Sequence, residues 1–434
     1  MIANLSYQFG PYQLLPYQRL LLMAGKHIPL DPQSFEVLHI LVQNSGKVIG
    51  RAELLEAAWD AYVEEGALAY QIYRLREALG DDPSHPTYIE TLRGRGFRFK
   101  APVKRVAVNR SEALSDADRL YLRGRYLWHK STSESVRKSI DYFQQALAQD
   151  PEYILAYTGI ADAWVLLGTF GHQSVSAIDA MPKAEEAAKQ ALKLDDTMAE
   201  AHAALASVKA LYLWEWQEAE KEFKYAVDRS PDPMIRAWYA LSLAARNEAE
   251  RARAEIEKAL EVDPTSPVLN AISGRIYYLA REYDEAVEQC SQAIELEEHF
   301  YLSRLFLGHA LRIKEDYQGA LAAFDSAAQL TGNHPTVVAE LGHLYGLIGD
   351  RDKAREILEE LFKLRESGVT YVSPYLIAHI YLGMGEEEAS LIWLERTFEE
   401  RGAYLIFLTT DPIYDSLAKQ PEFQKLVNRV GFTA

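Results

Sequence analysis

The residues with the strongest chemical signal are arginines gathered between positions 74 and 98. Arg74 and Arg76 lie two residues apart in one segment, and Arg93, Arg95 and Arg98 follow in a glycine-containing segment. A guanidinium group offers a planar fork of donors that matches the paired acceptors of guanine and the oxygens of phosphate. The stretch therefore favours recognition of a nucleic acid.

The sequence carries none of the common catalytic or cofactor-binding patterns. It has one cysteine, Cys290, and eleven scattered histidines, so no metal-ligand spacing and no nucleophile-base pair is recognisable. Gly94 and Gly96 lie in an expected hairpin, and no Walker lysine follows a glycine loop. We therefore expect neither an enzyme nor a bound cofactor or metal.

Two elements, a helix and a hairpin, are needed to position the arginines. Over residues 67–79, aliphatic side chains recur with helical spacing and form one stripe, Leu68, Ile72, Leu75 and Leu79. The opposite face carries Tyr70, Tyr73, Arg74 and Glu77. Residues 88–92 and 96–100 then predict two strands, joined by a tight glycine turn at residues 93–96.

The preceding residues complete a small domain. Segments 7–16 and 18–23 are rich in aromatic and branched residues and predict short antiparallel strands. Asp31 and Pro32 are typical of the start of a helix that ends at Gly46, and residues 51–59 predict a second short helix. A small sheet, three helices and a hairpin together predict an α+β winged helix-turn-helix domain over residues 1–105.

Four motifs of this segment resemble, in order, the OmpR/PhoB/ToxR/CadC type of bacterial DNA-binding domain. They begin at Leu30, Leu54, Ile72 and Tyr88 and read LDPQSFEVL, LLEAAW, IYRLREALGDD and YIETLRGRGFRF. The resemblance covers about 95 residues. It implies a recognition helix in the major groove of double-stranded DNA and a hairpin wing at the adjacent minor groove.

The resemblance also suggests roles for individual side chains. Arg74 matches the family's base-facing arginine. Further groove contacts are expected from Tyr70, Gln71 and Tyr73. Arg76 lies nearer the buried flank, where a phosphate contact or an intradomain contact suits it better. The wing is expected to neutralise phosphates or enter the minor groove through Arg93, Arg95 and Arg98.

Three features of the domain leave alternatives open. Arg51 either contacts phosphate from the start of the second helix or is simply solvated. Residues 60–66 correspond to a loop that can contact RNA polymerase in this family, although Glu64 and Glu65 also fit an ordinary turn. Glu77 departs from the basic residue common in the family at this position and would repel phosphate.

Charge is divided unevenly along the chain. Residues 1–105 carry 12 basic and 11 acidic side chains, whereas residues 106–434 carry 34 and 52. A polar, weakly patterned linker is expected at residues 106–116. No apolar run is long enough to span a membrane, and the lone cysteine fits a reducing compartment. We therefore expect a cytoplasmic protein without membrane contact.

From residue 117 onward a repeat of about 34 residues dominates. One column of small residues contains Ala184, Ala219, Ala252, Ala286, Ala320 and Ala354. A second column follows seven residues later, with bulky side chains between the two. This is the period and pattern of the tetratricopeptide (TPR) repeat, and it predicts an all-α solenoid of about eight repeats over residues 117–401. Residues 402–434 are expected to cap the last repeat.

Together these features predict a sequence-specific transcriptional regulator, with an arrangement similar to that of HilA-like regulators. The array would receive a protein, peptide or small-molecule signal, or would mediate self-association as a homodimer on DNA. Its acidic excess favours a basic partner or serves solubility. The alternative is a TPR scaffold or adaptor whose winged helix contacts protein rather than DNA.

Overall fold

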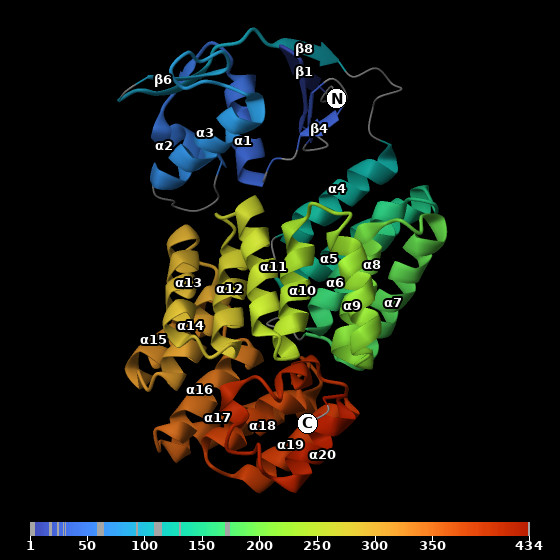
Figure 1. Ribbon diagram of the computed structural model, residues 1–434, viewed down its shortest axis with the longest axis vertical. Coiled ribbons are helices and arrows are strands. Elements are labelled where there is room, and N and C mark those ends of the chain that lie inside the picture. The colour runs from blue at the N-terminus through green and yellow to red at the C-terminus, as the bar shows by residue number, and fades with distance from the viewer. Residues whose placement is uncertain are drawn as a thin grey trace. The chain divides into compact units, whose positions relative to one another are not determined.

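The chain forms two compact units, Met1–Leu122 and Arg123–Ala434. Figure 1 shows strands together with α1, α2 and α3 in the first and a stack of helices in the second. The fold class predicted from the sequence, an α+β winged helix-turn-helix followed by an all-α TPR array, is confirmed. The computed structural model describes residues 5–16, 20–23, 26–28, 30, 32–58, 65–92, 94–107, 115–129, 132–169 and 174–432.

The first unit contains an antiparallel sheet with the strand order β4-β3-β2-β1-β8. Its strands are β1 (Leu5–Phe9), β2 (Tyr12–Leu15), β3 (Leu20–Met23), β4 (Lys26–Ile28) and β8 (Lys104–Ala107). Strand β8 pairs with β1, and Val106 lies opposite Ser6. The predicted boundary at residue 105 therefore cuts a strand and lies too early, because β8 is an edge strand with little pattern of its own.

Three helices and a second sheet complete the winged domain. The helices are α1 (Pro32–Gln43), α2 (Arg51–Ala58) and α3 (Glu65–Leu79). The second sheet has the order β5-β7-β6 and consists of β5 (Val48–Ile49), β6 (Ile89–Leu92) and β7 (Gly96–Phe99). The predicted stripe of α3 is fully buried in the core, at Leu68, Ile72, Leu75 and Leu79. The exposed side of α3 is therefore available for other contacts.

Consecutive helix pairs build the repeat array. Their bounds are α4 (Asp116–His129) and α5 (Ser133–Gln149), α6 (Ile154–Gly168) and α7 (Ala177–Leu194), α8 (Ala199–Val208) and α9 (Trp216–Val227), α10 (Pro233–Ala245) and α11 (Ala249–Val262), α12 (Pro267–Leu279) and α13 (Tyr283–Leu296), α14 (Tyr301–Ile313) and α15 (Tyr317–Leu330), α16 (Pro335–Leu347) and α17 (Arg351–Ser367), and α18 (Pro374–Gly383) and α19 (Glu387–Glu399). The predicted alanine column is buried, as the close packing of paired helices requires. The two compact units divide inside α4, after Leu122, and not within the predicted linker. No helix among the described residues combines the length and the apolar character needed to cross a membrane.

The C-terminal segment does more than cap the last repeat. It contains η3 (Ala403–Phe407), η4 (Pro412–Tyr414) and α20 (Pro421–Arg429). Arg429 pairs with Glu395 of α19 at 2.5 Å, as a cap would. The segment also reaches earlier repeats, because Trp216 Nε1 donates to the Val430 carbonyl at 3.0 Å and Asp411 pairs with Arg275 of α12 at 2.8 Å. It therefore ties together repeats that lie far apart in the sequence.

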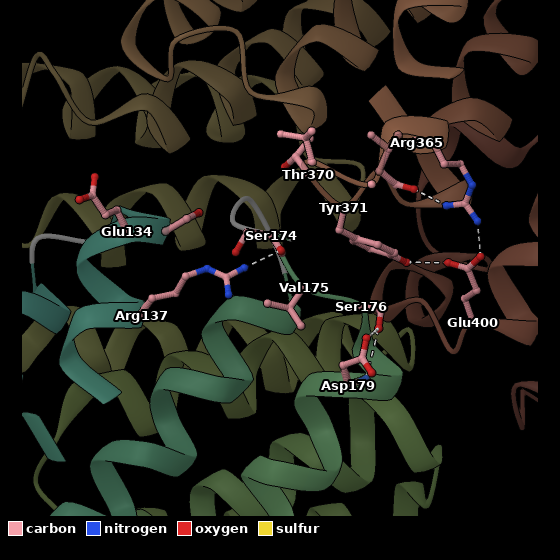
Figure 2. Close-up of a pocket in the computed structure, with 14 residues that line it drawn as sticks. Glu134, Arg137, Ser174, Val175, Ser176, Asp179, Arg365, Thr370, Tyr371 and Glu400 are labelled. Atoms are coloured by element: carbon pink, nitrogen blue, oxygen red, sulfur yellow. Dashed lines mark hydrogen bonds and ion pairs between the residues drawn. The ribbon is translucent and has the colours of Figure 1, made fainter. Parts of the chain in front are cut away.

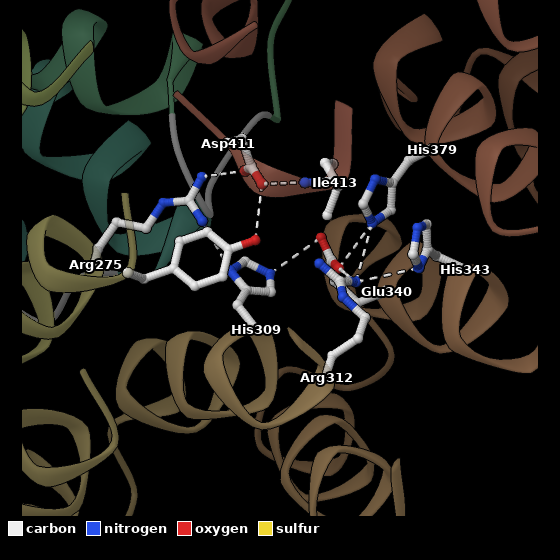
Figure 3. A network of polar contacts seen from close by, with 9 residues as sticks. Arg275, His309, Arg312, Glu340, His343, His379, Asp411 and Ile413 are labelled. Atoms are coloured by element: carbon white, nitrogen blue, oxygen red, sulfur yellow. Dashed lines mark hydrogen bonds and ion pairs between the residues drawn. The ribbon is translucent and has the colours of Figure 1, made fainter. Parts of the chain in front are cut away.

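A buried polar network lies where this segment meets the array (Figure 3). Arg312 on α14 donates to Glu340 Oε2 on α16 at 2.6 Å, and His379 Nε2 on α18 lies 2.8 Å from the same oxygen. His343 stacks on His379 with ring centroids 4.2 Å apart. Together with the buried pair of Arg275 and Asp411, these contacts join α12, α14, α16 and α18 to the C-terminal segment through charges that have been removed from water.

Candidate nucleic-acid interface

The exposed face of α3 presents tyrosine, arginine and glutamate side chains. Tyr73 is 57% exposed, and its hydroxyl donates to Glu77 Oε1 at 2.9 Å. This hydrogen bond raises the pKa of Tyr73. Arg74 and Tyr70 are half-buried, and each makes contacts within the protein. The face therefore offers hydrogen-bond donors and aromatic surface, together with one carboxylate that already has a partner.

Gln71 does not lie on this face, contrary to the prediction of a groove contact. It is buried, and its Oε1 accepts a hydrogen bond from Ser34 Oγ of α1 at 2.5 Å. Helical geometry explains the placement, because residue 71 lies three positions after Leu68 and four before Leu75, within the apolar stripe. Gln71 therefore fixes α3 against α1 and does not belong to the face that could contact DNA.

Arg76 makes the intradomain contact that was one of its two predicted roles. One guanidinium nitrogen, Nη2, donates to the Ile89 carbonyl at 3.0 Å and to Thr91 Oγ1 at 2.9 Å. Both acceptors belong to β6, so Arg76 joins α3 to the hairpin of β6 and β7. Its role as a phosphate contact is not supported by this arrangement.

Arg98 is also engaged inside the domain. Its Nε donates to Glu90 Oε2 at 2.8 Å, and the two residues lie opposite each other in the β6-β7 ladder. The pair is partly exposed, so solvent screens it and the pairing itself is weak. A phosphate would nevertheless have to compete with Glu90 for Arg98, which makes Arg98 a poorer wing contact than the sequence predicts.

The turn of the wing presents Arg95 to solvent. Its side chain is exposed, and within the described ranges its guanidinium has no hydrogen-bond or ion-pair partner. Arg51, at the start of α2, is also exposed, and its guanidinium carbon lies 5.9 Å from the centre of the Phe97 ring. Arg93 lies outside the described residues, as does most of the 60–66 loop for which a polymerase contact was predicted.

The second unit contains a cleft of about 1030 Å³ between the first repeats and the segment before α18 (Figure 2). Arg137 donates to the Ser174 carbonyl at 2.8 Å, while Tyr371 and Arg365 both bond to Glu400. The charged side chains that face this cleft are thus largely engaged with its own walls. Across the part of the chain that the structure describes, no group of three or more His, Cys, Asp or Glu side chains could hold a metal ion.

Comparison with known families agrees with the two-part architecture. Residues 25–99 match the family model described as "transcriptional regulatory protein, C terminal". Residues 208–267, 273–335 and 336–367 match tetratricopeptide repeat models. Neither description is that of a catalytic domain.

Individual relatives match only part of the chain. The transcriptional regulator HilA of Salmonella typhi is 38% identical over 103 residues, which are 24% of this chain and 18% of HilA. KdpE of Mycobacterium tuberculosis, a transcriptional regulatory protein, is 42% identical over 79 residues, which are 18% of this chain and 35% of KdpE. Among solved structures, the DNA-binding domain of Klebsiella pneumoniae RstA, in complex with the RstA box, is 26% identical. That match covers 22% of this chain and 96% of the RstA domain, with a TM-score of 0.21.

Proposed function

We propose that this chain, a transcriptional-regulator DNA-binding domain fused to tetratricopeptide repeats, binds a specific double-stranded DNA sequence and is controlled through its repeats. The observation that carries the proposal is the family match over residues 25–99, which contains α1, α2, α3 and the wing. DNA as the target places its action in the cytoplasm of a bacterial cell.

In this proposal α3 enters the major groove with its exposed side. The burial of its aliphatic stripe supports that orientation, because it leaves Tyr73 and Arg74 on the side away from the core. Arg74 donates a bidentate pair to guanine, a contact worth about 1–3 kcal/mol of discrimination, and Tyr70 adds to the groove surface. At the wing, Arg93 and Arg95 meet phosphates or the minor groove. Arg51 contributes a phosphate contact from α2.

The repeat array receives the signal in this proposal. Tetratricopeptide repeats support binding of a protein or peptide, and the excess of acidic side chains over residues 106–434 supports a basic partner. A small-molecule signal and a homodimer on DNA are compatible with the same arrangement. The loop at residues 60–66 is the proposed site of contact with RNA polymerase.

A scaffold or adaptor is the second candidate function. It is favoured by the carboxylate of Glu77 on the exposed side of α3 and by the neutralisation of Arg98 by Glu90. In that function the winged helix would bind protein, and the near-neutral charge of residues 1–105 would be no disadvantage.

Selection of DNA from a random pool by the full chain separates the two functions. We expect enrichment of one sequence, with binding that weakens steeply as salt rises. Arg74→Ala should lower the affinity for that sequence by about 5- to 150-fold, corresponding to about 1–3 kcal/mol, and relax preference at one base pair. Arg355→Ala, an exposed arginine of α17, is the matched control and should change neither quantity.

Two results would contradict these assignments. Failure of the full chain to enrich any DNA would rule out the DNA-binding regulator and favour the scaffold function. Enrichment that Arg74→Ala does not alter, in affinity or in base preference, would keep the regulator but remove the role of Arg74.

A further inference from the structure

Asp81 is a buried carboxylate between the recognition helix and the wing. It lies two residues after the end of α3 and is only 5% exposed. Its Oδ1 accepts hydrogen bonds from the backbone N–H groups of Thr87 at 2.6 Å and Tyr88 at 2.9 Å. Its Oδ2 accepts one from the Ile89 N–H at 2.8 Å. One side chain attached to the end of α3 thus binds three consecutive amides where β6 begins.

A second tie joins the same two elements. The Ile89 carbonyl accepts from Arg76 of α3 at 3.0 Å, so both backbone polar groups of Ile89 are bound by side chains on or beside the helix. Hydrogen bonds to an ionised group are roughly twice as strong as neutral ones. The start of β6 is therefore held to α3 by two charged side chains of opposite sign.

The chain between the two elements would not supply this rigidity. Residues 82–85 are exposed and belong to no helix or strand, and Gly80, directly after α3, has a φ of +59°. An exposed connection of this kind permits several orientations of the strand that follows it. The pairing of β6 with β7 and of β7 with β5, together with the buried side chains of Ile89 and Phe99, holds the wing to the domain. Asp81 and Arg76 add direct polar ties between the end of α3 and the start of β6.

We propose that Asp81 is a positioning residue for DNA recognition. It holds the wing in a fixed position relative to α3, so that Arg74 and Arg95 contact the DNA grooves at the same time. The inference rests on the proposed function and goes beyond it. In this inference the spacing between the DNA contacts of Arg74 and Arg95 is fixed by Asp81, a residue that itself does not contact DNA. Ordering the wing before binding lowers the entropy cost of placing Arg95.

The test is a double-mutant cycle on the DNA sequence that the full chain selects. Asp81→Asn keeps the shape of the side chain but removes its charge and replaces one acceptor oxygen with a donor. In the wild-type background, Arg95→Ala should weaken binding by about tenfold, the effect of one charge-assisted hydrogen bond. In the Asp81→Asn background the same substitution should have a clearly smaller effect, while Arg74→Ala should keep its full effect.

Asp82→Asn is the matched control. Asp82 is the next residue and an exposed carboxylate, and it accepts hydrogen bonds from the nearby Ser84 and His85. Its substitution should leave the effects of both arginine variants unchanged. Hydrogen exchange gives a readout without DNA: Asp81→Asn should speed exchange of the Thr87, Tyr88 and Ile89 amides and leave the α1 amides protected.

An equal effect of Arg95→Ala in both backgrounds would overturn the proposal and reduce Asp81 to a stabilising residue. If Asp81→Asn does not fold, Arg76→Met replaces it in the cycle, because it removes the tie at the Ile89 carbonyl and keeps the aliphatic stem. If Arg95→Ala weakens DNA binding as much in the Arg76→Met background as in the wild type, the proposal is likewise overturned. Failure of the wild-type chain to select DNA contradicts the proposed function. Selection of DNA with no coupling between the Asp81 and Arg95 substitutions contradicts only the role of Asp81.

Discussion

Truncation of Asp411 should destabilise the repeat array far more than truncation of Asp415, four residues later. Asp411 is 4% exposed, pairs with Arg275 Nη2 at 2.8 Å and accepts from the Tyr278 hydroxyl at 2.7 Å (Figure 3). Burial alone would raise the pKa of Asp411, but the charges of Arg275 and His309 and the hydrogen bonds from Tyr278 and Arg275 together outweigh burial and lower it. The carboxylate is therefore charged in the folded array and is matched there by a buried cation.

The expected magnitudes follow from burial. Removing one partner of a buried ion pair costs about 3–5 kcal/mol, because the other charge stays in the interior without compensation. Asp411→Ala also takes away the acceptor of the buried Tyr278 hydroxyl. Asp415 makes two hydrogen bonds with Arg281, at 2.6 and 2.7 Å, but both side chains are about half exposed. An exposed pair contributes about 0–1 kcal/mol, so the two variants should differ by at least about 2 kcal/mol.

Urea unfolding of the full chain, followed by far-ultraviolet circular dichroism, measures the difference. Repeat arrays need not unfold in one step, so the comparison uses transition midpoints of the variants under identical conditions. Asp411→Ala should lower the midpoint clearly, and Asp415→Ala should scarcely change it. Adding Arg275→Met to Asp411→Ala should recover part of the loss, because the uncompensated guanidinium is replaced by an apolar side chain.

Equal midpoint shifts for Asp411→Ala and Asp415→Ala would refute this reasoning, since burial is the main difference between the two pairs. The argument also fails if Arg275→Met makes Asp411→Ala still less stable. That result would mean that the packing of the arginine stem, and not its unpaired charge, determines the cost.

Three further predictions concern pH, the wing and the exposed side of α3. Burial lowers the pKa of His309 and His343, so the stability gained from their neutral rings is complete above about pH 6.5 and is lost as pH falls through the folded-state pKa values. We expect urea midpoints to fall as pH drops from about 6.5 to 5, because the free energy of unfolding decreases by up to about 1.4 kcal/mol per pH unit for each ring. Gly96→Ala should destabilise the winged domain by more than about 2 kcal/mol in thermal unfolding, because its Cβ would lie 1.9 Å from a backbone oxygen of β5 at a φ of +121°. Gly94→Ala, at a φ of +69° but with no atom within 4 Å, should cost only about 1–2 kcal/mol. Glu77→Lys should tighten DNA binding and steepen its salt dependence by about 0.9 for one added phosphate contact.

Each of these predictions has a result that contradicts it. A His343→Gln variant should show a flatter pH profile, and an unchanged profile would remove that ring from the explanation. Equal losses for the two glycine variants would mean that backbone conformation, and not the approach to β5, decides the cost. Weaker DNA binding by Glu77→Lys would indicate that the carboxylate contributes favourably to the interface.

Much of the fold could be predicted from local patterns. The stripe from Leu68 to Leu79 identifies α3 and its buried side, because apolar side chains at helical spacing have to leave water together. The alanine columns identify the repeats for a similar reason, since close helix packing excludes larger side chains. The motif around Arg74 predicted a helix of a DNA-binding domain, and the family match over residues 25–99 includes this helix.

The partners of polar side chains were decided by the tertiary structure. Gln71 looks like a surface residue in the sequence, yet Ser34, from another helix, makes its burial acceptable. Glu90 neutralises Arg98 across a strand pair, and Asp411 crosses the array to reach Arg275. The sequence by itself thus determined which helices form and which of their sides are apolar, because both depend on neighbours a few residues away. Only the tertiary structure decided which charges remain available for DNA or for a partner, because each is satisfied or left exposed by residues brought close through folding.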